Sequence, residues 1–298
     1  MKIFFDNVNF GSNSGPNSFG RKLATSFVKK GHELGTDNPD VQLSFIQSSN
    51  NLAPTVLRLD GIYFNSEQAW ENLNAPIKYS HGESAGVIYQ SNFNKVLTEK
   101  YFGIKENSVV VHNGTDLELI EKIQPLSYEP LDKYETVWCC ASSWRPHKRL
   151  SENVRYFLEH KDDNSCLIIA GKNPDHNINH PDIFYTGNLD WTTLISLYKR
   201  SKYFIHLALM DHCPNVVVDA AASGCHIICT SSGGTHEIAG QNATMIQDME
   251  WDYKPFKLYN PPKLDFSNKT KLTKKINFDI NRVADQYLDF LQTTINNV

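Results

Sequence analysis

The segment MDHCPNVVVDAAASG carries two aspartates, Asp211 and Asp219, eight positions apart. Because proline is favoured in the first turn of a helix, the pattern predicts Asp211 in a loop, a helix opening at Pro214, and Asp219 in its second turn. The amides at such a helix start, here Asn215 and Val216, and the helix dipole both favour a phosphate. A phosphate between two acids suits a nucleotide sugar, with one acid for sugar hydroxyls and one for ribose hydroxyls. On spacing alone, ordinary helix-capping acids are the favoured alternative.

Glycines and cations near this segment could serve the same ligand. The motif GGTHEIAG, residues 233–240, follows one strand later, and its paired glycines allow close approach of the backbone. Upstream, ASSWRPHKRL places Arg145, Lys148 and Arg149 after a predicted strand, at the edge where open α/β sheets bind ligands. Cations there can neutralise a diphosphate. We assign Lys148 to the site and expect Arg149 on a solvent-exposed helix face.

The amino-terminal glycines do not form a dinucleotide fingerprint. Gly11, Gly15 and Gly20 follow the first apolar run without the GxGxxG spacing, which disfavours a dehydrogenase. They still provide a small-residue loop that could lie against a phosphate or a sugar. The pair Asn113-Gly114 in VVVHNGTD is typical of a tight turn and is assigned a structural role.

Apolar runs alternate with amphipathic stretches along most of the chain, which predicts parallel sheets with right-handed crossovers. The first series has strands in MKIFF, VQLSFI, TVLRL, AGVIYQS and SVVVH, and helices over residues 17–31 and 92–103. The second has strands in ETVWCCA, SCLIIAG, DIFYTG, YFIHLAL, HIICTS and ATMIQ, and helices over 151–161, 192–201 and 214–224. The fold class is therefore α/β, with two Rossmann-like domains.

The domain boundary is expected in YEPLDKY, residues 128–134, whose composition suits a linker. This predicts one Rossmann-like domain over residues 1–130 and a second over 131–275. Apolar spacing in the last segment, 276–298, predicts a helix that packs back on the first domain.

Composition is near the globular average, with 298 residues, 40% hydrophobic and 21% charged. The net charge of -4 gives no basic face for nucleic acid, so that class of partner is excluded. The six cysteines lack a paired spacing and are expected to be buried thiols, which favours the cytosol. The first residues, MKIFFDNVNF, are too short and polar for a signal peptide, and no apolar run approaches the roughly 20 residues of a transmembrane helix. We expect a cytoplasmic protein and leave peripheral membrane attachment open.

These motifs together resemble a GT-B glycosyltransferase of family GT4, the glycosyl transferases group 1. The signature of that family is an acid, seven residues, a second acid, a small-residue run and a GG loop, which here reads DHCPNVVVDAAASGCHIICTSSGGTHEIAG. Also similar are GPNSFGRKLATSFVKKGHE, VIYQSNF, VVVHNGTD, KRL and LIIAGK. The ordered motifs span most of the chain, which makes the resemblance specific.

The resemblance implies transfer of a sugar, in many relatives a hexose, with retention of anomeric configuration. The donor would be a UDP- or GDP-linked sugar held by the carboxy-terminal domain. The acceptor, a glycan, a lipid-linked or another hydroxyl compound, would bind the amino-terminal domain, with reaction in the cleft between them. It further implies no cofactor and no obligatory metal, and the sequence has no D-x-D metal motif. The oligomeric state is left open.

The resemblance also implies roles for residues at the matching positions. Asp219 matches the acid that binds the ribose, and Asp211 the acid that contacts the transferred sugar. Asn215 and Val216 match the helix start near the sugar and the phosphates. Lys148 matches the lysine that contacts the diphosphate.

Further positions follow from the same resemblance. Gly15 matches the glycine loop near the phosphates, and Asn188 and Leu189 fall where the base meets backbone atoms. Two features depart from the family pattern: both signature acids are usually glutamates, and the arginine expected five residues before Lys148 is replaced by Ser143. Arg145 is the candidate substitute for that arginine.

In the amino-terminal domain, Asp60 in LRLDGIYF stands where many relatives have a histidine. It could bond the donor sugar or the acceptor hydroxyl, or be an ordinary turn residue. His81 is a weaker candidate, expected in a surface loop. Two other functions stay open: a GT-B nucleotide-sugar epimerase, and a sugar-nucleotide-binding protein without transfer activity.

Overall fold

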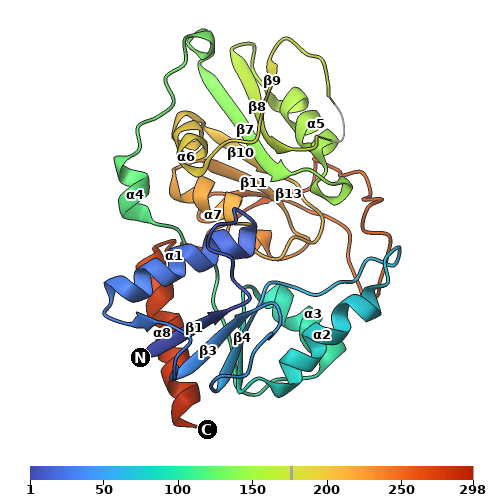
Figure 1. Cartoon of the computed structure of the whole chain (residues 1–298). Helices are drawn as coiled ribbons and strands as arrows, with labels where there is room; N and C mark the ends of the chain where they lie inside the picture. The colour runs from blue at the N-terminus through green and yellow to red at the C-terminus, as the bar shows by residue number, and fades with distance from the viewer. Residues whose placement is uncertain (175–176, 298) are drawn as a thin grey trace. The chain divides into compact units, whose positions relative to one another are not determined.

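The computed structural model describes residues 1–174 and 177–297, and the chain divides into two compact units. Unit 1 comprises Met1–Asp116, Tyr253–Phe256 and Asn277–Val298, and unit 2 comprises Leu117–Asp252 and Lys257–Ile276. Each unit is a mainly parallel sheet with helices packed on it (Figure 1), so the expected α/β class with two Rossmann-like units is confirmed. The first crossing between units lies at Asp116, ahead of the linker expected near residue 130.

Unit 1 contains six parallel strands in the order β2-β1-β3-β4-β5-β6. They are β1 (Lys2–Asp6), β2 (Glu33–Leu34), β3 (Val41–Phe45), β4 (Thr55–Leu59), β5 (Gly86–Tyr89) and β6 (Ser108–Val110). Strands β3 and β5 are buried along their whole length, as a parallel sheet covered on both faces requires. The sequence of β5 is an apolar run, whereas β3 alternates and buries Gln42 and Ser44, which hydrogen-bond to each other and to Asp6.

The helices of unit 1 are α1 (Gly15–Lys29), α2 (Trp70–Glu83), α3 (Asn92–Phe102) and α8 (Ile280–Asn296). Helices α1 and α8 pack side by side (Figure 1), so the end of the chain completes the core of the amino-terminal sheet. That core joins Ile3 and Leu43 from the strands to Leu23, Tyr287 and Leu291 from the helices.

Two details of unit 1 differ from the sequence expectations. Helix α1 begins at Gly15, two residues before the predicted start, so both Gly15 and Gly20 lie in the helix rather than in a loop. A Cβ at Gly20 would lie 3.0 Å from Val8 Cγ1, which explains a glycine at a buried helical position. Helix α2 was not predicted, because Pro76 interrupts its apolar pattern.

His81 lies in α2 and is buried, so its expected place in a surface loop is wrong. Its Nε2 lies 3.0 Å from the Tyr89 hydroxyl, and its ring packs edge-on against Phe102. Burial, with the nearby Lys105 charge, lowers the pKa of His81 to about 4. The side chain is therefore held as a neutral, packed imidazole.

This shift predicts a pH dependence of folding stability. Because the folded pKa lies below the unfolded value of 6.5, the stabilisation by neutral His81 is complete above pH 6.5 and is lost as the pH falls toward 4. When the unfolding free energy is measured with urea between pH 6.5 and 4.5, its slope against pH should be smaller in His81→Gln than in the wild type by about 1 kcal/mol per pH unit. Between pH 7.5 and 8.5 the slopes of the variant and the wild type should agree. Equal slopes over the acid range would contradict the prediction.

The described residues of unit 2 form a seven-stranded sheet in the order β13-β12-β11-β10-β7-β8-β9, parallel except for the edge strand β13. They are β7 (Thr136–Ser143), β8 (Ser165–Lys172), β9 (Ile183–Gly187), β10 (Tyr203–His206), β11 (His226–Thr230), β12 (Thr244–Ile246) and β13 (Lys269–Lys271). The helices are α4 (Leu117–Lys122), α5 (Leu150–His160), α6 (Trp191–Arg200) and α7 (Asn215–Ala222). The strand order reverses between β7 and β10, which is where open α/β sheets bind ligands.

The cysteines agree with the sequence expectation. All six cysteines are buried free thiols. Within residues 1–174 and 177–297, no helix is both long enough and apolar enough to cross a bilayer.

Candidate functional site

Three loops meet at the carboxyl edge of the unit 2 sheet, after β7, β10 and β11. The Leu209 amide donates to the His147 carbonyl at 2.7 Å, and the Gly234 amide donates to the Asp211 carbonyl at 2.7 Å. Gly233 has φ +76°, and a Cβ there would lie 2.5 Å from the Asp211 carbonyl oxygen. Glycine is therefore required where the third loop crosses the second.

The central polar contact joins Lys148 to Asp211. Their Nζ and Oδ2 atoms are 2.5 Å apart, and His206 Nε2 lies 2.9 Å from the same oxygen. The Lys148 and Asp211 side chains are 18% and 16% exposed, so a ligand can reach both while they are paired. The pair, formed by residues 63 positions apart, was not expected from the sequence.

The electrostatics of this pair are set by its neighbours. Burial alone would raise the pKa of Asp211, but the Lys148 charge and the His206 bond outweigh it and hold the pKa well below the usual range. Burial lowers the pKa of His206, so its neutral ring donates from Nε2 to the carboxylate. Burial and the Lys148 charge lower the pKa of His147 to about 3. At neutral pH the site thus holds a charged lysine–aspartate pair among neutral imidazoles.

Helix α7 begins at Asn215, one residue after the predicted start at Pro214, which is its extended N-cap residue. Its amino end, Asn215 and Val216, follows the Asp211 loop directly in the chain. Asp219 lies one turn further along and is 4% exposed. The Trp191 indole Nε1–H donates to Asp219 Oδ2 at 2.9 Å. This bond ties α7 to the first residue of α6, immediately after the loop that contains Asn188 and Leu189.

The remaining candidates of unit 2 lie at or near its surface. Arg145 is exposed and precedes the short 3-10 helix Pro146–Lys148. Asn188 is exposed and Leu189 half-buried, between β9 and α6. The structure therefore brings Lys148 and Asp211 into contact and places Asn188 and Leu189 next to the partner of Asp219.

Two candidates belong to unit 1. Gly15 is the first residue of α1 and is exposed. Asp60 directly follows β4 and forms an ion pair with the buried Arg58. Arg58 also bonds Asn113 Oδ1 at 2.8 Å and the Tyr287 hydroxyl at 3.1 Å. A buried cation thus holds Asp60 at the carboxyl edge of its sheet. An ordinary turn residue does not require such an ion pair.

Arg149 is not on a solvent-exposed helix face, so that expectation is wrong. It is 2% exposed and forms a two-bond ion pair with Asp248, which follows β12. Its backbone is left-handed, with φ 53° and ψ 50°, so residue 149 ends the 3-10 helix and redirects the chain into α5.

Sequence reasoning also missed His206, Trp191 and Asp248. His206 ends the apolar strand YFIH, and a polar residue at the carboxyl end of a buried strand is a usable signal. No sequence spacing indicates the partners of Trp191 or Asp248, because those contacts join separate elements of the sheet.

Comparison with known proteins shows which family model and which folds the chain resembles. Residues 135–252 match the family model described as glycosyl transferases group 1, whereas no curated protein sequence matches the chain. The structure is similar to HepE from Anabaena in complex with UDP-glucose, with TM-score 0.68 and 14% identity over 98% of this chain and 100% of HepE. It is also similar to sucrose-phosphate synthase from Thermosynechococcus elongatus, with TM-score 0.67 and 11% identity over 100% and 92% of the two chains.

A third similar structure is WaaG, a glycosyltransferase involved in lipopolysaccharide biosynthesis, with TM-score 0.62 and 11% identity over 100% of this chain and 94% of WaaG. The chain thus has the GT-B glycosyltransferase fold. The match to the glycosyl transferases group 1 model lies within unit 2, over residues 135–252.

Proposed function

We propose that this protein is a retaining glycosyltransferase that moves a sugar from a nucleotide-diphosphate sugar to a hydroxyl acceptor. The observation that carries the proposal is the Lys148–Asp211 pair at the strand reversal of unit 2, next in the fold to the start of α7. A fixed cation and a helix amino end suit the diphosphate of such a donor, and nearby carboxylates suit the hydroxyls of its sugar and ribose.

The proposed donor contacts follow the geometry of unit 2. Lys148 and Arg145 bind the diphosphate, together with the amides of Asn215 and Val216. Asp211 accepts from a sugar hydroxyl, using a carboxylate that Lys148 and His206 keep ionised.

Other groups are assigned to the nucleoside, the sugar and the acceptor. Asp219 accepts from the ribose, the backbone at Asn188 and Leu189 meets the base, and Gly15 lets the chain approach the phosphates. Asp60, oriented by Arg58, bonds the sugar or the acceptor hydroxyl. HepE was solved with UDP-glucose, which favours a UDP-linked hexose as the first donor to test, with GDP-linked sugars second.

In the proposed reaction, the bond between the anomeric carbon and the donor phosphate oxygen breaks as the acceptor oxygen bonds that carbon from the same face. The bonding electrons leave with the diphosphate, where negative charge grows and Lys148 and Arg145 stabilise it. The departing phosphate takes the acceptor proton. No nucleophile of the protein is needed, and we propose that no metal or cofactor is needed either.

We also propose a cytoplasmic location, with a glycan, lipid-linked or other hydroxyl compound as acceptor. A lipid-linked acceptor would place the protein at a membrane surface only peripherally.

The test of the proposed function is a panel of UDP-, GDP- and ADP-sugars, read by thermal stabilisation and by slow donor hydrolysis. Stabilisation by one nucleotide with hydrolysis of its sugar is expected, since a ligand that binds only the folded state raises the melting temperature. Stabilisation without hydrolysis or transfer would favour the binding protein, and a 2-epimerised nucleotide sugar would favour the epimerase. A panel without any stabilisation would contradict the proposal.

A further inference from the structure

A buried ion pair, which the proposed reaction does not use, lies among the loops of the donor site. Arg149 Nη1 is 2.7 Å from Asp248 Oδ2, and Arg149 Nη2 is 3.1 Å from Asp248 Oδ1. Both side chains are only 1% exposed. The pair is bidentate, an arrangement that the planar guanidinium can make and the ammonium of lysine cannot.

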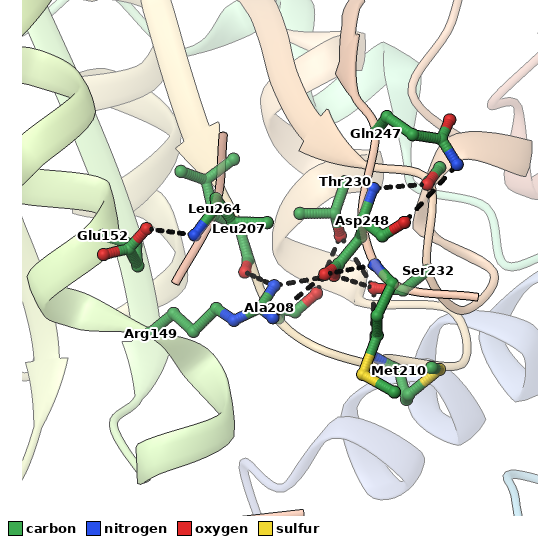
Figure 2. Close-up of polar contacts among 12 residues, drawn as sticks. Arg149, Glu152, Leu207, Ala208, Met210, Thr230, Ser232, Gln247, Asp248 and Leu264 are labelled. Carbon is green, nitrogen blue, oxygen red and sulfur yellow. Dashed lines mark hydrogen bonds and ion pairs between the residues drawn. The ribbon is translucent and has the colours of Figure 1, made fainter. Parts of the chain in front are cut away.

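The polar contacts of the pair connect the three loops that follow β7, β10 and β11 (Figure 2). Asp248 Oδ2 also accepts from Ser232 Oγ at 2.6 Å, one residue before Gly233. The Met210 amide, one residue before Asp211, donates to the same Ser232 hydroxyl at 3.5 Å. Arg149 itself follows Lys148 in the chain. The hydrogen-bonded chain from Arg149 through Asp248 and Ser232 to Met210 thus lies one residue from Lys148, from Gly233 and from Asp211.

The backbone at Arg149 shows why the pair is needed at this place. A left-handed conformation is unfavourable for arginine and persists only where the surroundings impose it. The Asn153 side-chain amide donates to the carbonyls of Lys148 at 3.1 Å and Arg149 at 2.9 Å, which fixes the turn on the side of α5. The salt bridge between Arg149 and Asp248 fixes the same turn on the side of the sheet.

We propose that Arg149 and Asp248 are positioning residues of the donor site: their ion pair holds the Lys148 turn against the Asp211 and Gly233 loops. The proposal rests on the proposed function, because it assigns the pair to the geometry of the same site. Neither residue touches the donor. The pair acts through Lys148, whose ammonium must stay within reach of both Asp211 and the diphosphate.

The variants are chosen to separate the effect of losing the ion pair from the effect of the left-handed backbone at Arg149. Arg149→Lys keeps the charge but loses the bidentate contact, and Asp248→Asn keeps the size but loses the charge. The double variant Arg149→Gly with Asp248→Asn relaxes the left-handed backbone and leaves no buried charge unpaired. The matched control is Arg155→Lys, because Arg155 lies on α5 and pairs with Glu152 and Glu159, away from the three loops.

Two measurements test the proposal on folded protein. Calorimetry with UDP, GDP and ADP should show affinity about tenfold or more lower in all three pair variants, since small displacements of a binding group are costly. Arg155→Lys should bind as the wild type does. Hydrogen exchange should quicken at the Leu209 and Gly234 amides, which join the loops, while amides of β8 stay protected.

A double-mutant cycle distinguishes positioning from a general loss of stability. If the pair acts through Lys148, Asp248→Asn should weaken binding tenfold in the wild type but add little in Lys148→Ala. Additive losses, or wild-type affinity in the double variant Arg149→Gly with Asp248→Asn, would overturn the proposal. If the wild type binds none of the three nucleotides, the proposed function fails instead. Hydrogen exchange then tests the role of the ion pair without a ligand. Unchanged protection of the Leu209 and Gly234 amides in the pair variants would overturn that role.

Discussion

Replacing Lys148 with alanine is expected to lower the turnover of sugar transfer by about 100- to 1000-fold while the fold persists. The reason is electrostatic: in the proposed reaction, the negative charge that develops on the departing diphosphate would lose its fixed cation. The change should appear mainly in kcat, because the charge is greatest in the transition state. Donor hydrolysis or transfer under saturating donor measures it.

The chain supplies a matched control for this variant. Lys161 forms a second lysine–aspartate pair in unit 2, with Nζ 2.9 Å from Asp182 Oδ2, at the opposite edge of the sheet. Lys161→Ala removes the same side chain from a similar pair and should leave turnover within about twofold of the wild type, as for ordinary surface changes. Near-normal transfer by Lys148→Ala would remove Lys148 from the reaction.

Replacing Asp219 with alanine is expected to weaken nucleotide binding by about 10- to 100-fold, the value of a charged hydrogen bond to a buried partner. The proposed ribose role gives the loss a signature. The wild type should bind UDP more tightly than its 2′,3′-dideoxy analogue, and Asp219→Ala should bind the two nearly alike. Calorimetry with both ligands measures this difference.

Two further variants control for side effects at Asp219. Asp219→Asn keeps the side-chain volume next to Trp191 and should give an intermediate loss. Asp182→Ala removes a carboxylate from the amino edge of the sheet and should leave the preference for UDP unchanged. A variant lacking Asp219 that still prefers UDP over the dideoxy analogue would refute the ribose assignment.

The parts of the structure that sequence could predict are those fixed by local pattern. The apolar runs of β5 and β8 marked buried parallel strands, because strands covered on both faces favour continuous apolar residues. Pro214 marked the start of α7, because proline fits the first turn and lacks the amide that a helix start leaves unused.

The parts that escaped prediction depend on contacts between distant elements. Arg149 has a charged sequence context, and only the position of Asp248, 99 residues later, explains its burial. Likewise, the left-handed backbone at residue 149 has no signature in an arginine. Helix α2 escaped because Pro76 breaks its pattern, and His81 was misplaced with it.

In the candidate site, too, the residue types could be predicted from local sequence, whereas the contacts between distant residues could not. The residue types and order in ASSWRPHKRL and MDHCPNVVVDAAASG indicated which groups could hold a phosphate. The direct pairing of Lys148 with Asp211, and of Trp191 with Asp219, follows from the strand order β10-β7-β8-β9, which no local pattern encodes.

The central claim is that the loops after β7, β10 and β11 of unit 2 hold a nucleotide-diphosphate donor. A crystal structure of the protein soaked with UDP, or with the nucleotide that stabilises it best, tests this most directly. The account predicts diphosphate oxygens within about 3 Å of Lys148 Nζ and of the Asn215 or Val216 amide, with the ribose at Asp219. A nucleotide bound at the amino edge of this sheet, or on unit 1 alone, would contradict it.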